Sequence, residues 1–247
     1  MIKKIIKKIL YIIFPDRCIT CNKLISPDST FCEYDWGKLK YILEPKCKVC
    51  CTNLINKINF DSLCAKCFKN KNIYFDYCES VFFYNETIRV AILQFKNNDQ
   101  THLSVKLGRI LAKNLAEKTN DYEIIAPVPL HKSRARKRKY NQSLLLCKEI
   151  IKTHNHLKLY PDLLSRKSMA RSQKNLSMKQ RSANVKDSII LNEKYKELVK
   201  NKKIIIVDDV VASSSTVNEC AKSLKKNGAK EVMVSALAKS TKNLKNY

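Results

Sequence analysis

The stretch IIIVDDVVASSST, residues 204–216, places two adjacent carboxylates directly after an apolar run. Branched apolar residues in series are typical of a buried strand in a parallel sheet, and Asp208 and Asp209 follow them at once. A turn of small and hydroxyl side chains comes next, made of Ala212, Ser213, Ser214, Ser215 and Thr216. Because ligands bind beyond the carboxyl ends of strands in open parallel sheets, we expect a ligand site here.

Phosphate is the anion that such a turn can hold, through consecutive backbone amides, the start of the following helix and the hydroxyl groups. Two carboxylates beside a phosphate are compatible when the ligand is a sugar phosphate. Asp208 and Asp209 would then accept hydrogen bonds from ribose hydroxyls or meet a bridging Mg²⁺, while the turn takes the 5-phosphate. The alternative is structural, with one acid capping the helix and the other lying on the surface.

Cysteine pairs at metal-ligand spacing lie near the N-terminus, where nine of the eleven cysteines fall between Cys18 and Cys78. A Cys-x-x-Cys turn places two thiolates on one side of a tight loop, and two such turns complete a tetrahedral Zn²⁺ site. One predicted site consists of Cys47, Cys50, Cys64 and Cys67. The other consists of Cys18, Cys21, Cys32 and, by spacing, Asp35.

Disulfides are the alternative to zinc for these cysteines, and they need an oxidising compartment. The sequence shows no pattern of a secretion signal, which favours zinc. Asp35 has its own alternative, as a solvated turn residue. Cys147 and Cys220 lie in apolar helical contexts, where we expect buried thiols.

Strands and helices alternate from about residue 77 onward. Apolar patterning predicts strands in CESVFFY, EIIAPVP, KKIIIVD and EVMVSALA. Helical spacing predicts helices in ETIRVAILQFK, HLSVKLGRILAKNLAEK, NQSLLLCKEIIKT and STVNECAKSLKKN, the last ended by Gly228. Such alternation argues for an α/β fold with a mostly parallel sheet covered on both faces. We expect an amphipathic helix at 1–16, a zinc-ribbon module at 17–76 and the α/β domain at 77–247.

The net charge of +26 results from 48 Lys and Arg against 22 Asp and Glu in 247 residues. Such an excess indicates an anionic partner, either nucleic acid, a phosphorylated metabolite or an acidic membrane surface. Only three glycines occur. A chain so poor in Gly and so rich in Lys, Ile and Asn is typical of an AT-rich genome, so part of the charge reflects coding bias.

The N-terminal residues MIKKIIKKILYIIF place isoleucines at helical spacing, with lysines opposite. The uncharged apolar run is too short to span a bilayer. This helix either packs on its own protein or lies on a membrane surface. We expect a cytoplasmic protein, with peripheral attachment to the inner membrane as the alternative.

Residues 204–216 resemble the signature of type I phosphoribosyltransferases, with apolar positions, two acids, two apolar positions and a hydroxyl-rich loop. Three further stretches resemble the ComF family: FPDRC before the cysteine module, APVPLHKSRARKRKYNQSLLL, and LLSRKSMARSQKNLSMKQRSANV. The resemblance implies a type I phosphoribosyltransferase-like sheet flanked by helices, joined to an N-terminal zinc-ribbon module. It also implies structural Zn²⁺ and the binding of phosphoribosyl pyrophosphate (PRPP) with Mg²⁺.

Two glycine positions of the family pattern carry larger residues in this chain. Ser214 stands at the glycine of the family's Thr-Thr-Gly-x-Thr loop, and Lys139 replaces the glycine before the aromatic-Asn-Gln element. If the backbone is left-handed there, a Cβ atom costs roughly 1–2 kcal/mol. We expect phosphate affinity to be weakened rather than abolished, because Ser213 and Thr216 keep their hydroxyls.

Basic residues crowd the run HKSRARKRK and the block that follows it. By the resemblance, family positions are matched by Lys96, Arg134, Arg138, Asn141, Gln142, Arg166, Gln173 and Arg181, and Arg136 belongs to the same basic run. Arginine offers planar, bidentate donors to phosphate. These residues would bind pyrophosphate or follow a single-stranded DNA backbone, and the plainer alternative is a solvated charged loop.

The ComF family is associated with natural DNA uptake, so the resemblance implies handling of single-stranded DNA together with proteins of the uptake machinery. Three functions fit the sequence. The first is a ComF-like protein that binds PRPP or a related sugar phosphate and single-stranded DNA. The second is an active phosphoribosyltransferase in nucleotide salvage, and the third is a scaffold whose ligand loop has decayed. No side chain stands out as a general base, so no catalytic residue is assigned.

Overall fold

The computed structural model describes residues 15–54, 62–70, 72–97, 100–130, 139–167, 188–212 and 214–240. Within these residues no helix has the length and apolar character needed to cross a membrane. The helix expected at 1–16 lies almost wholly outside the described residues. The same holds for six predicted site residues, which are Arg134, Arg136, Arg138, Gln173, Arg181 and Ser213.

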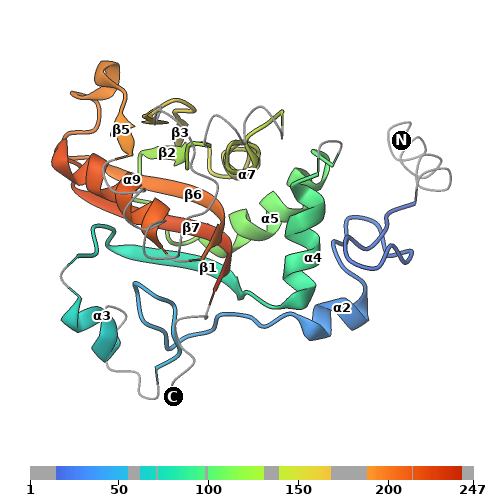
Figure 1. Cartoon of the computed structure of the whole chain (residues 1–247). Helices are drawn as coiled ribbons and strands as arrows, with labels where there is room; N and C mark the ends of the chain where they lie inside the picture. The colour runs from blue at the N-terminus through green and yellow to red at the C-terminus, as the bar shows by residue number, and fades with distance from the viewer. Residues whose placement is uncertain are drawn as a thin grey trace, which may run out of the picture.

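One parallel sheet of five strands organises the molecule, in the order β1–β7–β6–β2–β3 (Figure 1). The strands are β1 (Tyr77–Phe83), β2 (Ile124–Pro127), β3 (Lys158–Leu159), β6 (Lys203–Val211) and β7 (Glu231–Lys239). The parallel sheet confirms the predicted α/β class. Strand β3 was not expected, because a two-residue element carries no readable periodicity.

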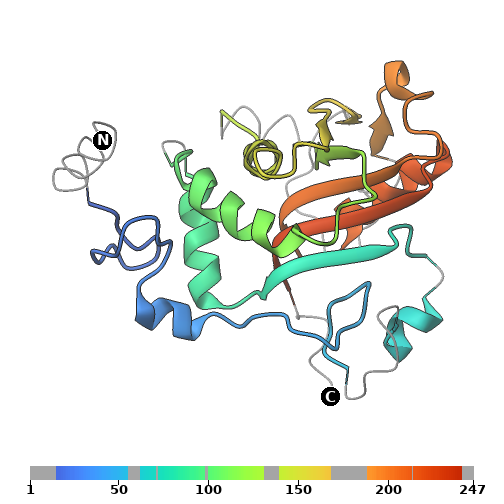
Figure 2. The same ribbon diagram turned by 180° about the vertical axis from the view of Figure 1, so that it is seen from behind.

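Helices cover both faces of the sheet, as Figures 1 and 2 show. One face carries α4 (Glu86–Phe95), α5 (Leu103–Leu115) and α7 (Gln142–Ile150), and the other carries α9 (Ser215–Lys226). Strand β6 contributes to the hydrophobic cores on both faces of the sheet. Ile205 and Val207 pack with α4, α5 and α7, whereas Ile204 and Ile206 pack with α9. Side chains alternate along a strand, so the continuous apolar run is what burial on both faces requires.

Side chains and one glycine define the helix ends. Asn85 caps α4 by accepting a hydrogen bond from Ile88 N at 3.1 Å. Helix α9 ends at Asn227 and is followed by Gly228 with φ of 88°. That left-handed residue confirms the predicted glycine termination.

The cysteine-rich module packs along the free edge of β1. Ile42 N donates to Val81 O at 2.9 Å, and Phe83 N donates to Lys40 O at 2.8 Å. The module contains the short helices α2 (Glu33–Lys38) and α3 (Ala65–Lys69), which lie at opposite ends of β1 in Figure 1. Its apolar residues join both cores of the α/β domain. The module therefore protects an edge that would otherwise expose unpaired backbone groups.

A small antiparallel pair lies outside the main sheet. Strand β4 (Leu164–Arg166) pairs with β5 (Ile189–Leu191), and the one-turn helix η1 (Glu193–Tyr195) follows. Neither strand was predicted, because three residues are too few to show a period of two. The pair matters for the site, since β4 ends in Arg166.

Candidate functional site

Strand β6 extends beyond its neighbour β2, and the offset opens the sheet beside the acid pair, Asp208 and Asp209. Strand β2 ends at Pro127, opposite Val207. Strand β6 continues beside β7 as far as Val211. We expected the acids to end the strand, but they lie inside it because β7 continues the pairing on one side. The site predicted beyond the carboxyl end of a strand is therefore created by the end of β2, not by the end of β6.

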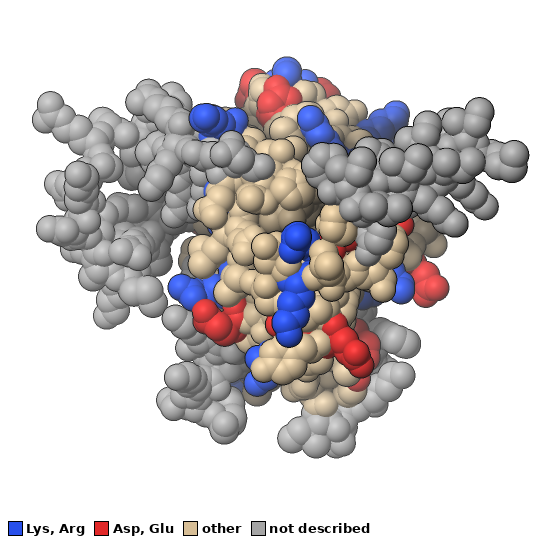
Figure 3. All heavy atoms as spheres, turned by 90° about the vertical axis from the view of Figure 1, so that its right-hand side faces the viewer, with Lys and Arg blue, Asp and Glu red and all other residues tan. Residues whose placement is uncertain are grey.

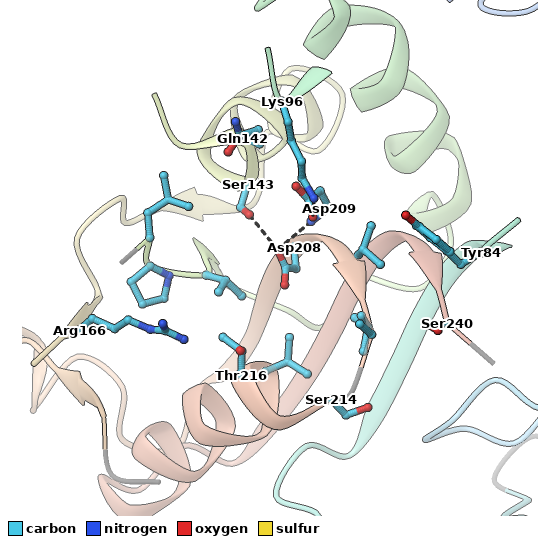
Figure 4. Close-up of a pocket in the computed structure, with 17 residues that line it drawn as sticks. Tyr84, Lys96, Gln142, Ser143, Arg166, Asp208, Asp209, Ser214, Thr216 and Ser240 are labelled. Atoms are coloured by element: carbon cyan, nitrogen blue, oxygen red, sulfur yellow. Dashed lines mark hydrogen bonds and ion pairs between the residues drawn. The ribbon is translucent and has the colours of Figure 1, made fainter. Parts of the chain in front are cut away.

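A cavity of about 430 Å³ opens beside the acid pair (Figure 4). We call it the first cavity. Side chains from separate elements form its polar wall, which includes Lys96, Gln142, Ser143, Arg166, Ser214 and Thr216. The segment after β2 and the start of α9 complete the wall. The tertiary structure thus brings together both acids and residues from two blocks that lie far apart in the sequence.

The two acids differ in environment. Asp209 is 7% exposed, and its Oδ1 lies 2.9 Å from Lys96 Nζ. Asp208 Oδ1 accepts hydrogen bonds from Ser143 Oγ at 3.2 Å and from Asp209 N at 2.9 Å. Burial, and next the charge of Asp209, raise the pKa of Asp208 to about 7. Asp208 is therefore partly protonated at neutral pH and would ionise when a cation arrives beside it.

Two cationic side chains approach the first cavity. Lys96 follows α4 and forms the ion pair with Asp209, so its predicted phosphate contact competes with a carboxylate. Arg166 comes from β4, and Figure 4 shows its guanidinium directed into the cavity from the side opposite Tyr84. Arg166, which the sequence predicts to bind phosphate, thus lines the first cavity.

The turn before α9 has the strained backbone that its sequence suggested. Ser214 has φ of 60°, and Lys139 has φ of 61°. Both residues stand where we noted a missing glycine. The Ser214 hydroxyl points away from Asp208 and accepts a hydrogen bond from Lys239 Nζ at 2.6 Å (Figure 4). We expected this hydroxyl to add a phosphate donor, but it is engaged behind the turn, whereas Thr216 lines the cavity.

The element Tyr140-Asn141-Gln142 positions the start of α7. Asn141 Oδ1 accepts from the amides of the first turn, and its Nδ2 donates to Val128 O at 3.1 Å. Tyr140 donates to Phe95 O at 2.8 Å, which ties it to the end of α4. Gln142 is buried and lines the first cavity. Of the two amides that we predicted to bind anions, Gln142 faces the cavity and Asn141 caps the helix.

Two clusters in the N-terminal module place their ligand atoms within 4.8 Å of one another. They are the predicted sets Cys47, Cys50, Cys64, Cys67 and Cys18, Cys21, Cys32, Asp35. Cys50 Sγ and Cys64 Sγ are 3.6 Å apart, close to the roughly 3.8 Å expected between two thiolates on tetrahedral Zn²⁺. All eleven cysteines are free. The thiol geometry fits structural zinc.

Asp35 completes the cluster of Cys18, Cys21 and Cys32 from a buried position. It is 7% exposed, which excludes a solvated turn residue. Its Oδ2 lies 3.1 Å from Cys18 Sγ and 3.2 Å from Cys32 Sγ. Burial tends to raise the pKa of Asp35, but hydrogen bonds from Thr20 and the cysteines outweigh it and hold the pKa below its usual value. An ionised carboxylate in this position is a suitable zinc ligand.

Sequence reasoning missed Ser143, Tyr84 and Lys239. Ser143 follows the Asn-Gln element by one position and bonds to Asp208 across the cavity. Tyr84 follows β1 and lines the cavity because β1 ends beside β7. Only the apolar strand EVMVSALAK ending in a lysine could have drawn attention to Lys239.

Two domain families match this chain, one after the other. A double zinc ribbon domain matches residues 9–68, and a phosphoribosyl transferase domain matches residues 104–246. Hypoxanthine phosphoribosyltransferase of Staphylococcus aureus aligns with a TM-score of 0.37 at 16% identity, covering 54% of this chain and 62% of that one. The parallel sheet, the acid pair and the matched domain define a phosphoribosyltransferase-fold protein with an N-terminal double zinc ribbon.

Two relatives of similar length identify the family within this class of protein. The chain is 31% identical to competence protein F of Haemophilus influenzae over 181 residues, which are 71% of this chain and 78% of that protein. It is 32% identical to DNA utilization protein YhgH of Escherichia coli K12 over 162 residues, which are 63% of this chain and 69% of that protein. The chain belongs to the competence protein F family.

Proposed function

We propose that the first cavity binds PRPP, or a related sugar phosphate, together with Mg²⁺. The observation that carries the proposal is the division of charge across this cavity. The acid pair lies on one side, while the Arg166 guanidinium and the start of α9 lie on the other. A phosphorylated sugar has the complementary pattern, with hydroxyl groups for the acids and phosphates for the cation and the helix start.

The acid pair is also a suitable site for the cation. Mg²⁺ prefers carboxylate oxygens and substrate phosphates as ligands, and both carboxylates line the first cavity. Bound Mg²⁺ would neutralise pyrophosphate charge. Lys96 holds the Asp209 carboxylate in place, and Ser143 does the same for Asp208. The acids are therefore oriented before ligand arrives.

Calorimetry with PRPP and Mg²⁺ tests this assignment. Asp208→Asn combined with Asp209→Asn should abolish Mg²⁺-dependent binding, because each amide lacks the negative charge that holds the cation and has an NH₂ donor in place of one acceptor oxygen. The matched control is Asp121→Asn, which removes an exposed carboxylate that pairs with Lys203 at the amino end of β6, away from the first cavity. Unchanged affinity in the double variant would remove the assigned site.

The second part of the proposal is that the chain handles single-stranded DNA during DNA uptake. Two observations support it, namely the net charge of +26 and the names of the relatives competence protein F and DNA utilization protein YhgH. On the face in Figure 3, the described Lys and Arg side chains are interspersed with acidic ones. The basic runs at 131–138 and 168–187 lie outside the described residues. We assign the proposed footprint to those runs because their sequence concentrates Lys and Arg.

Salt-dependent binding tests the DNA proposal. Fluorescence anisotropy of a labelled single strand should give a logarithmic salt slope of about −0.7 for each phosphate neutralised. Charge reversal of Arg134, Arg136 and Arg138 should flatten that slope. Reversal of Lys152, an exposed lysine paired with Glu149 on α7, is the control. An equal slope in both variants would move the DNA footprint away from this run.

Transferase activity in nucleotide salvage is the second candidate. The match of residues 104–246 to a phosphoribosyl transferase domain favours it. Catalysis in such a site would depend mainly on positioning and electrostatic stabilisation. Release of pyrophosphate from PRPP in the presence of a purine or pyrimidine base would establish this activity. Tight PRPP binding without pyrophosphate release in the presence of any tested base would favour a protein that binds PRPP without transferring its ribosyl group.

A further inference from the structure

An apolar groove of about 680 Å³ opens on the surface of the cysteine-rich module. Its apolar side chains are Leu24, Ile25, Pro27, Phe31 and Trp36. Leu24 is 62% exposed, which leaves a large aliphatic side chain in water. Contiguous exposed apolar surface is typical of an interaction site, so we expect an occupant for this groove.

The described chain begins at one wall of this groove. Asp16 O accepts a hydrogen bond from Ile25 N at 3.0 Å, and Arg17 pairs with Leu24 in an isolated antiparallel bridge. Leu24 and Ile25 themselves line the groove. The segment that precedes Pro15 is therefore tethered beside the groove, and the tether gives that segment a high effective concentration there.

Residues 1–14, MIKKIIKKILYIIF, carry a pattern that complements the groove. Helical spacing gives the segment an apolar stripe, made of Ile2, Ile5, Ile6 and Ile9, with lysines opposite. The double zinc ribbon match begins at residue 9, so the second half of the segment belongs to the matched domain. Glu33 also lines the groove and is exposed, which places a negative charge within reach of the lysines.

We propose that residues 1–14 dock through their isoleucine stripe into the apolar groove, so that this segment covers its own chain and not a membrane surface. Isoleucine side chains would then pack against Leu24, Phe31 and Trp36, while the lysines face solvent and Glu33. Burial of one isoleucine side chain favours the docked state by about tenfold to a hundredfold. The proposal is independent of PRPP and DNA binding.

Docking would also shield one of the metal clusters. Cys32, a ligand atom donor of the cluster that Asp35 completes, lines the groove. Cys21 of the same cluster is exposed. Because the apolar surroundings of a metal site control solvent access, an occupied groove limits the approach of water and chelators from this side. Zinc in this cluster should therefore be released more slowly while the segment is docked.

Acrylamide quenching of Trp36 fluorescence in the full, zinc-loaded chain tests the proposal, because Trp36 is the single tryptophan and lines the groove. Ile6→Asp combined with Ile9→Asp should raise the quenching constant and shift the emission to longer wavelength, since the groove is then open to water. The matched control is Lys4→Gln combined with Lys7→Gln, which changes the net charge equally on the opposite face and should leave both signals unchanged. Unchanged quenching in the isoleucine double variant would overturn the proposal.

A variant on the groove side tests the same contact from the other partner. Leu24 is exposed, so Leu24→Asp should fold. It should accelerate trypsin cleavage after the lysines of residues 1–14 by about tenfold to a hundredfold, because cleavage follows the undocked population. Leu43→Asp is the control, since Leu43 is 67% exposed in the same module and does not line the groove. Equal cleavage rates in the two variants, measured by mass spectrometry of the intact chain, would refute docking at this groove.

Two further measurements separate docking from membrane binding. Wild type should stay in the supernatant when it is sedimented with vesicles of phosphatidylglycerol and phosphatidylcholine. Sedimentation with the vesicles that is lost in the Ile6→Asp, Ile9→Asp variant, while Trp36 quenching is the same in both proteins, would assign the segment to a membrane surface and overturn the proposal. EDTA should remove the first zinc equivalent faster from this variant than from wild type, and equal rates would contradict docking over Cys32.

Discussion

Ser214 and Lys139 share a left-handed backbone, with φ of 60° and 61°, yet glycine should change stability in opposite directions at the two positions. A Cβ atom in this conformation costs roughly 1–2 kcal/mol, and glycine removes that cost. Glycine also loses about 0.5–1 kcal/mol through its larger freedom in the unfolded chain. At Lys139, which is exposed, these two effects alone apply. Lys139→Gly should therefore raise the free energy of unfolding by about 0.5–1 kcal/mol.

Ser214 has a further interaction that glycine removes. Its Oγ accepts the 2.6 Å hydrogen bond from the buried Lys239 ammonium, and hydrogen bonds to charged groups contribute about 1.5–3 kcal/mol. This loss exceeds the relief of backbone strain. Ser214→Gly should therefore lower the free energy of unfolding by about 1–2 kcal/mol, although glycine is the residue that the family pattern has there.

Urea denaturation of the zinc-loaded chain measures both effects, since a shift in midpoint at constant slope reports stability. Ser214→Ala is the matched control, because it loses the hydroxyl and keeps the strain. Alanine should therefore cost more than glycine at this position. A Ser214→Gly variant more stable than wild type would show that Lys239 gains little from the hydroxyl. A destabilised Lys139→Gly variant would refute the strain argument itself.

Three further outcomes follow from the acid pair and the metal clusters. The folded pKa of Asp208, about 7, lies above the ordinary value of 3.8, so its ionisation destabilises the fold as pH rises between these values. Asp208→Asn should therefore stabilise the ligand-free chain by roughly 2–4 kcal/mol at pH 8 and by almost nothing near pH 4. Thermal melts at the two pH values measure this, and a difference in stability between variant and wild type that does not change with pH would contradict it. Asp35→Ala should lower the zinc content by one equivalent in metal analysis. The control is Asp28→Ala, which removes an exposed carboxylate of the same module and should leave the zinc content unchanged. Equal zinc content in both variants would remove Asp35 from the site. Chelation of zinc should unfold the module and expose the edge of β1 to hydrogen exchange. Unchanged protection of the Phe83 amide, which donates to Lys40 O, would show that the edge is held without metal.

Much of the fold could be predicted because its signals are local. The apolar run before Asp208 must be buried on both faces, and the helical periods around it supply the covering layers, which together require a parallel sheet. Two-residue gaps likewise predict two four-ligand clusters, one of four cysteines and one of three cysteines with Asp35, because each turn presents its ligand atoms on one side. Short strands such as β3, β4 and β5 could not be predicted, since two or three residues show no period.

The sequence by itself determined the class of the sheet, the two cysteine clusters and the position of the acid pair in the chain, because each depends on spacing within a single element. Only the tertiary structure decided what those residues contact. It ended β2 before β6, paired Lys96 with Asp209, raised the pKa of Asp208 and turned the Ser214 hydroxyl toward Lys239. These outcomes depend on distances between elements that are far apart in the chain, and desolvation and Coulomb energies are set by those distances.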